Sequence, residues 1–193
     1  EHCEVTGVYA NDAFLSAAKA DPCDTAGTLK TALSGEDPNE NPKIQRLNKY
    51  LNLSSAANIK ILWPTEQVCQ DQDLGDNDKS VVSLIGFAGR KILLCSDIEE
   101  FAQQQLRRLF PDLRANIVVA PHHGLGKSLQ AKFLETLDAD ILICSCGQSQ
   151  YERALDSVTR NPNKSKSFYT ARDGAIIVRI NKYGTIKTDV LVE

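Results

Sequence analysis

The chain has 193 residues, of which 42% are apolar, so it is long enough and apolar enough to bury a core. Its 22 basic and 25 acidic residues give a formal net charge of −3, which argues against a strong nucleic-acid binder with a basic face. A bound metal ion would add positive charge, so nucleic acid stays open as a partner. No apolar run approaches the roughly 20 residues that cross a bilayer, and we expect no membrane contact by this chain itself.

The N-terminal part of the sequence is the less readable one. A strand-like run covers Val5–Tyr9, and Ser34–Pro42 has the residues of an exposed turn. The apolar residues between Ile44 and Leu53 follow the spacing of a short amphipathic helix in part. The sequence contains no methionine, which favours a segment of a longer polypeptide over a chain that lost its initiator. We treat 1–193 as a single domain, in which 1–58 is the less certain segment.

The elements are clearer from residue 59 onward, and strands alternate with helices from Ser80. Ile59–Pro64 predicts a strand ended by proline, and Val81–Phe87 with Lys91–Cys95 predicts a hairpin. A helix follows over Ile98–Leu109. The later elements are strands and helices in turn, with predicted strands at 115–120, 140–146, 167–170, 175–180 and 186–192 and predicted helices at 129–137 and 151–158. This order predicts an α/β fold with antiparallel ends.

Three polar clusters fall where these strands begin or end. They are Asn77-Asp78-Lys79-Ser80, Ser96-Asp97 and His122-His123-Gly124. Ligand sites of α/β sheets gather beyond the carboxyl ends of strands, so we expect Asp97 and the two histidines to converge. Together they offer oxygen and nitrogen ligands suited to zinc, manganese or iron.

Each cluster also has a structural interpretation. Asp97 precedes a helix and would cap it, in which case its replacement by alanine costs about 1 kcal/mol without any metal. Asp78 would be an ordinary turn residue, and a single buried histidine is more often hydrogen-bonded than a ligand.

The cysteines give a second, weaker signal. Strand alternation places Cys144 and Cys146 on one face, either as buried thiols or as a metal or redox pair. Cys3 and Cys23 would pair in an oxidising compartment.

The order of the polar motifs resembles a known family. Asn77-Asp78-Lys79-Ser80, a hairpin, Asp97 before a helix, and a strand leading into Pro121-His122-His123-Gly124 resemble the C-terminal metallo-β-lactamase-like domain of the ComEC family of DNA-uptake competence proteins. The resemblance covers 59–193, including the closing segment Phe168–Ile176. It implies the second half of a four-layer αββα sandwich, incomplete at its N-terminal side.

The resemblance also implies a function. It suggests a hydrolase that uses zinc or manganese to attack single-stranded DNA or another phosphodiester. Asp97 and His123 match the catalytic positions, with Asp97 as the bridging aspartate and His123 as a more direct ligand than His122. Asp78 matches a ligand or a residue behind the ligands. The parent would be an inner-membrane protein, with this domain soluble and facing outward.

The sequence departs from the family at several positions. The family's first metal cluster, a His-x-(His or Asp)-x-Asp-His run, is absent, and the one other histidine is His2. Ser96 stands where the family has glycine, Leu125 where it has serine, and a late Gly-His-Pro element is missing. Two explanations fit. Either an omitted N-terminal half of the domain supplies the missing ligands, or the chain is a degenerate, non-catalytic binding or scaffolding module.

Overall fold

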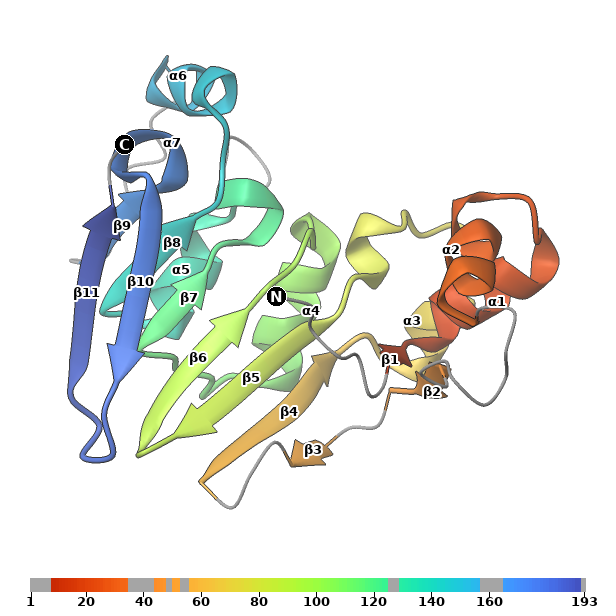
Figure 1. The fold of residues 1–193 in the computed structure, drawn as a ribbon, viewed down its shortest axis with the longest axis horizontal. Helices are drawn as coiled ribbons and strands as arrows, with labels where there is room; N and C mark the ends of the chain where they lie inside the picture. The colour runs from red at the N-terminus through yellow and green to blue at the C-terminus, as the bar shows by residue number, and fades with distance from the viewer. Residues whose placement is uncertain are drawn as a thin grey trace. The chain divides into compact units, whose positions relative to one another are not determined.

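A seven-stranded sheet forms the centre of the computed structural model (Figure 1), which describes residues 8–34, 44–47, 50–52, 56–124, 129–156 and 165–191. The strand order is β3-β4-β5-β6-β7-β8-β9. Neighbours are antiparallel from β3 to β6 and parallel from β6 to β9, so the α/β prediction with an antiparallel end is confirmed. The strands are β3 Tyr50–Asn52, β4 Ala57–Trp63, β5 Val82–Phe87, β6 Arg90–Leu94, β7 Ile117–Val119, β8 Ile141–Cys144 and β9 Lys166–Tyr169.

The predicted hairpin is the pair β5 and β6. Its turn places Ala88 at φ 48° and Gly89 at φ 74°, the left-handed conformations that a tight two-residue turn needs. The register then sets Ile85 opposite Ile92 and Gly86 opposite Lys91. A second hairpin, β10 (Ala175–Ile180) with β11 (Ile186–Leu191), forms a separate two-stranded sheet.

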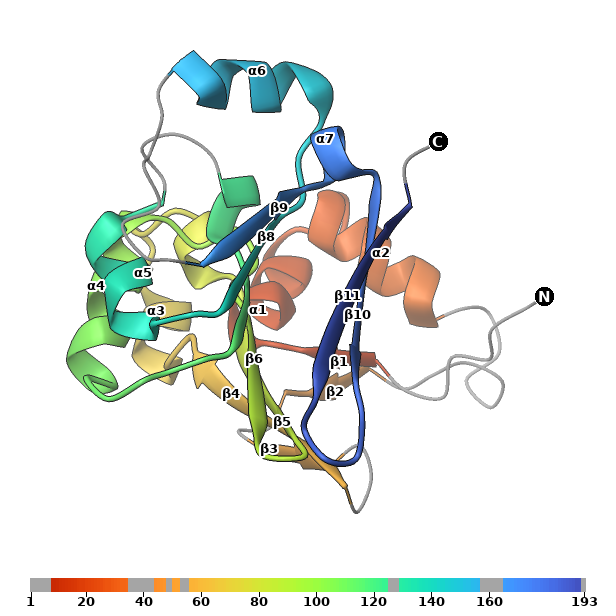
Figure 2. The same cartoon turned by 90° about the vertical axis from the view of Figure 1, so that its left-hand side faces the viewer.

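The two faces of the central sheet are covered differently (Figure 2). Helices α4 (Glu100–Leu109) and α5 (Ala131–Leu137) lie against one face, and the β10–β11 hairpin lies over the other. Alternation along β7 explains this, because Val118 is fully buried on one side while Ile117 joins an apolar cluster with Ile141 and residues of the hairpin on the other. The sheet is therefore buried on both faces along its parallel half.

The remaining C-terminal elements lie close to their predicted places. Helix α6 (Gln148–Asp156) begins three residues earlier than predicted, and a short helix, α7 (Thr170–Asp173), follows β9. Within the described ranges, no helix combines the length and the apolarity needed to span a membrane.

The N-terminal part holds short elements. Strand β1 (Val8–Ala10) pairs in parallel with β2 (Ile44–Arg46), and the helices are α1 (Asp12–Ala20), α2 (Thr25–Ser34) and α3 (Glu66–Gln70). The stretch between Ile44 and Leu53, which fitted helical spacing only in part, contains β2 and β3. Three-residue strands are too short for a readable period, so their partners decide the conformation. Most of the predicted turn at Ser34–Pro42 lies outside the described residues.

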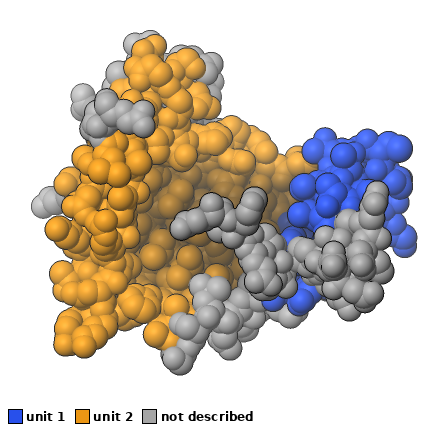
Figure 3. Space-filling view, viewed as in Figure 1, with its two compact units in different colours: residues 1–48, 65–74 blue, residues 49–64, 75–193 orange. Residues whose placement is uncertain are grey.

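The chain divides into two compact units (Figure 3). The first comprises Glu1–Asn48 and Thr65–Leu74, and the second comprises Lys49–Pro64 and Gly75–Glu193. The prediction of one domain over 1–193 stays a prediction. All polar clusters singled out in the sequence belong to the second unit.

Candidate functional site at the carboxyl edge of the sheet

The predicted histidines and Asp97 meet at the edge where the parallel strands end. Asp97 follows β6, His122 and His123 follow β7, and Ser145 follows β8. These three strands are neighbours in parallel register, so the segments that leave them are neighbours as well. A backbone hydrogen bond from His122 N–H to the Ser96 carbonyl, 3.0 Å long, ties the first two segments together.

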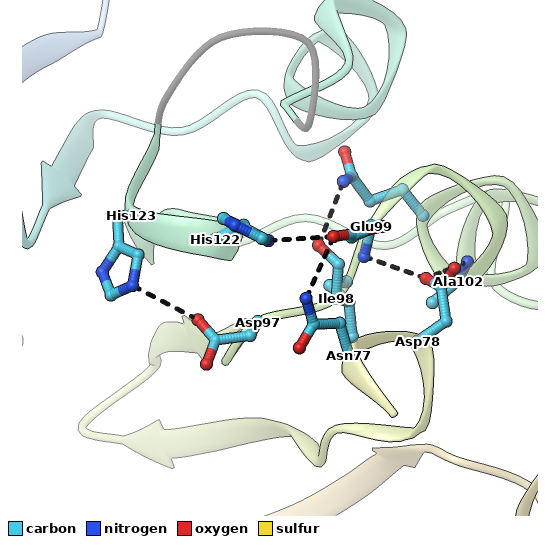
Figure 4. A network of polar contacts seen from close by, with 9 residues as sticks. Asn77, Asp78, Asp97, Ile98, Glu99, Ala102, His122 and His123 are labelled. Carbon is cyan, nitrogen blue, oxygen red and sulfur yellow. Dashed lines mark hydrogen bonds and ion pairs between the residues drawn. The ribbon is translucent and has the colours of Figure 1, made fainter. Parts of the chain in front are cut away.

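Asp97 and His123 form one pair (Figure 4). The His123 Nε2 atom lies 3.8 Å from an Asp97 carboxylate oxygen, and the two side chains are about half exposed. His123 Nδ1 lies 2.8 Å from the Ser145 carbonyl oxygen. Because a carbonyl only accepts, Nδ1 carries the proton, and the Nε2 lone pair of a neutral ring faces Asp97. Two acceptors facing one another are stabilised by a positive species between them, either a proton on the ring or a cation.

His122 belongs to a different pair. Its Nδ1 atom lies 3.2 Å from a Glu99 carboxylate oxygen, which also accepts a 3.0 Å hydrogen bond from the Asn77 amide. The Nδ1 atom is buried and makes no hydrogen bond to the described residues, so its approach to Glu99 is an ion-pair contact alone. The planes of the two imidazole rings are inclined at 86°, with ring centroids 5.9 Å apart, so the rings face different carboxylates. No feature of the sequence predicted Glu99 as a partner of His122.

The backbone of this edge is strained. His122 and His123 have φ of 46° and 66°, and Ser96 before Asp97 has φ 50°. Such left-handed conformations cost a non-glycine residue roughly 1–2 kcal/mol. Such strain persists where the surrounding structure holds the backbone in place, and strained residues often lie at functional sites. At Ser96, a glycine would adopt the same backbone conformation without this cost.

Gly124 completes the histidine turn. Its φ is 74°, and a Cβ atom built there would lie 2.3 Å from the Cys144 sulfur and 3.1 Å from the Ala120 Cβ. Glycine therefore lets the turn pass directly over the end of β8, which brings His123 to the Ser145 carbonyl.

Two buried cysteines lie beside this turn. Cys144 and Cys146 are buried on the same side of an exposed Ser145, as strand alternation predicted. Burial raises the pKa of the Cys144 thiol to about 12, so the reactive thiolate is scarce near neutral pH. The predicted partner of Cys23, Cys3, lies outside the described residues.

Asp78 is held away from the Asp97–His123 pair (Figure 4). One of its carboxylate oxygens accepts hydrogen bonds from the backbone N–H groups of Glu99 at 2.9 Å and Ala102 at 3.0 Å. The side chain is buried, and the indole of Trp63 donates a 2.7 Å hydrogen bond to the Asp78 carbonyl. Asp78 thus caps helix α4 from a separate segment. Its predicted role as a metal ligand stays a prediction, and one of its two carboxylate oxygens already accepts the capping hydrogen bonds.

The prediction that Asp97 caps the helix is wrong. The N-cap residue of α4 is Glu99, whose side chain makes no capping hydrogen bond. Asp78 takes that role instead, because the turn Asn77–Lys79 packs beside the start of α4. The Asp97 carboxylate is therefore left to face His123.

The described residues do not complete a metal site. Among them, no group of three or more histidine, cysteine, aspartate or glutamate side chains is placed to hold one ion. Asp97 and His123 supply two converging donors.

No family model matches the chain. ComE operon protein 3 of Bacillus subtilis (strain 168) is similar to part of it. The two sequences are 25% identical over 115 residues, which is 56% of this chain and 15% of that protein. The chain therefore corresponds to a small fraction of the relative's length. The similarity indicates a competence-related relationship, in agreement with the expectation from the motifs.

Proposed function

We propose that the chain is the second half of a metallo-β-lactamase-like domain from a metal-dependent phosphodiesterase or nuclease associated with DNA uptake, and that it is inactive by itself. The observation that carries this proposal is the Asp97–His123 pair. A metal-binding histidine usually donates its other ring N–H to a carbonyl or carboxylate, which is how His123 contacts Ser145.

The arrangement of layers supports the fold part of the proposal. Helices cover one face of the central sheet, and a two-stranded sheet covers the other, as in one half of an αββα sandwich. Between hairpin and sheet lies an open apolar concavity of about 440 Å³. Its lining is apolar throughout, with Ile92, Val119, Ile143, Ile176 and Val178 among the residues.

An omitted N-terminal half of the domain is the proposed cover for this concavity and the proposed source of the missing ligands. ComE operon protein 3 is several times longer than the matched stretch, which leaves room for such a half in the relative. The coding sequence upstream of Glu1 tests this. We expect a His-x-(His or Asp)-x-Asp-His run there, and an upstream sequence without one would contradict the proposal.

The ligand shortage explains the proposed inactivity. A catalytic zinc site needs about three protein ligands, whereas Asp97 and His123 provide two. A metal that loses much of its ligand set loses most of its affinity. When bound to the complete site, zinc or manganese would supply a metal-activated water for attack on single-stranded DNA or another phosphodiester.

A nuclease assay tests the proposed inactivity. We expect the chain to cleave single-stranded DNA little or not at all with Mn²⁺ or Zn²⁺ present. Robust metal-stimulated cleavage that disappears in His123→Ala would show that the chain has a complete site after all.

A non-catalytic binding or scaffolding module is the second candidate. It is favoured by Asp78, whose carboxylate caps a helix, and by the direct approach of His122 to Glu99, which is a structural contact. Calorimetric titration with Zn²⁺ tests for a retained site. Heat that is lost in Asp97→Asn supports a retained partial site, and the absence of heat fits both the module and a half that lacks its other ligands.

The proposed cellular setting follows from the resemblance to competence proteins. In this setting the domain belongs to an inner-membrane protein and faces outward, with no membrane contact of its own. Accessibility of the domain to added protease in cells with a permeabilised outer surface tests it, and protection there would contradict the outward orientation.

A further inference from the structure

A second concavity lies around the turn between β5 and β6. This turn is at the opposite end of the two strands from the edge where Asp97 follows β6 (Figure 1). Its volume is about 440 Å³, and it is lined by Asn58, Lys60, Arg90 and Lys91 around a floor of Leu84 and Gly86. None of the described residues that line it is acidic. The concavity is thus cationic in a chain whose formal net charge is −3.

The strand register explains why the polar side chains gather. Asn58 pairs with Gly86, which pairs with Lys91 on the next strand, and Lys60 pairs with Leu84. Side chains of directly paired residues point to the same face, so Asn58, Lys60 and Lys91 share one face around Gly86. Lys60 and Lys91 lie two strands apart and two residues apart along the strand direction. Their Cα atoms are therefore separated by roughly 12 Å, a distance that two lysine side chains can span by converging on one small anion.

Gly86 keeps the floor of the concavity low. A Cβ atom there would lie 3.0 Å from the Asn58 side-chain oxygen, so glycine lets the Asn58 amide lie close against the sheet. The amide can then act as a donor beside the two ammonium groups.

The cations are not neutralised by the protein. Lys60 and Arg90 are half-buried, and their recorded partners are neutral, since the Lys60 ammonium lies 5.5 Å from the Phe110 ring centroid and Arg90 Nε donates to the Gly184 carbonyl at 2.6 Å. In the part of the chain that the structure describes, no carboxylate forms an ion pair with Lys60, Arg90 or Lys91. Lys91 is exposed, and a concave wall strengthens the field of all three cations.

We propose that this concavity binds a phosphate-bearing anion, held between Lys60 and Lys91 with the Asn58 amide as an additional donor. The site is separate from the Asp97–His123 pair and does not depend on metal binding. The phosphate belongs either to a small soluble ligand or to the backbone of an oligonucleotide.

The test compares two double variants that change the net charge equally. Lys60→Gln with Lys91→Gln removes the cations of the site, and Lys182→Gln with Lys187→Gln removes two exposed cations of the β10–β11 hairpin. Binding of inorganic pyrophosphate is measured by calorimetry, and binding of a short fluorescent oligothymidylate by anisotropy at several salt concentrations. Thermal unfolding of both variants checks that they remain folded.

We expect the first double variant to weaken binding by roughly tenfold or more, because two charge-assisted contacts are lost, and the hairpin variant to change it less than about twofold. Binding of pyrophosphate alone identifies a small phosphate ligand. Binding of oligothymidylate that pyrophosphate displaces identifies a nucleic-acid backbone. The proposal is overturned if neither probe binds or if both double variants weaken binding equally.

Discussion

Asp78 shows how a single side chain can fix the start of a helix from a distance in the sequence. We predict that Asp78→Ala lowers the free energy of unfolding by about 2 kcal/mol, because two backbone N–H groups, one buried and one partly buried, lose their acceptor. Asp97→Ala is the matched control. Its half-exposed carboxylate caps nothing, so its effect should stay within about 0.5 kcal/mol. Urea unfolding of both variants measures the difference, and a larger loss in Asp97→Ala would contradict the structure.

Ser96 combines strain with a compensating contact. Its left-handed backbone favours glycine, while its hydroxyl donates a 2.6 Å hydrogen bond to the Val81 carbonyl. Ser96→Ala keeps the strain and loses the hydrogen bond, so it should cost about 1 kcal/mol. Ser96→Gly loses the bond but relieves the strain, and its cost should be smaller. If thermal unfolding ranks glycine below alanine, the left-handed conformation of Ser96 is not what the structure indicates.

At the scale of elements, the histidine turn depends on Gly124. Gly124→Ala should destabilise the protein by about 2 kcal/mol more than Gly89→Ala. Both glycines have φ 74°, but a Cβ atom at Gly89 meets nothing within 4 Å, whereas one at Gly124 meets the Cys144 sulfur. The pair therefore separates steric overlap from backbone conformation. Equal losses in denaturant unfolding would mean that the turn does not pack over β8 as described.

The central strands were predictable because they are apolar runs with clear boundaries. Residues 44–53 were not, since β2 and β3 each have three residues and depend on their partners β1 and β4. The start of α4 was misread for a related reason. Its capping side chain is Asp78, which lies 21 residues before Glu99. The local sequence around Asp97 does not indicate that contact.

For the molecule as a whole, the sequence predicted where the candidate site lies but not how its side chains pair. Asp97 and the histidines were predicted to lie close together because the carboxyl ends of parallel strands meet at one edge of a sheet. Which histidine faces which carboxylate depends on the left-handed backbone of His122 and His123 and on the Ser145 carbonyl, and these follow from packing of the turn on β8. Glu99 and Ser145 were therefore missed.

The central claim is that Asp97 and His123 form a partial cation site at this edge. Titration of the ¹⁵N-labelled chain with Mn²⁺, followed by NMR, detects even weak binding through paramagnetic broadening. We predict that amide signals around Asp97 and His123 broaden first and that Asp97→Asn abolishes this selectivity. Broadening that spares these residues, or that is unchanged in Asp97→Asn, would contradict the account.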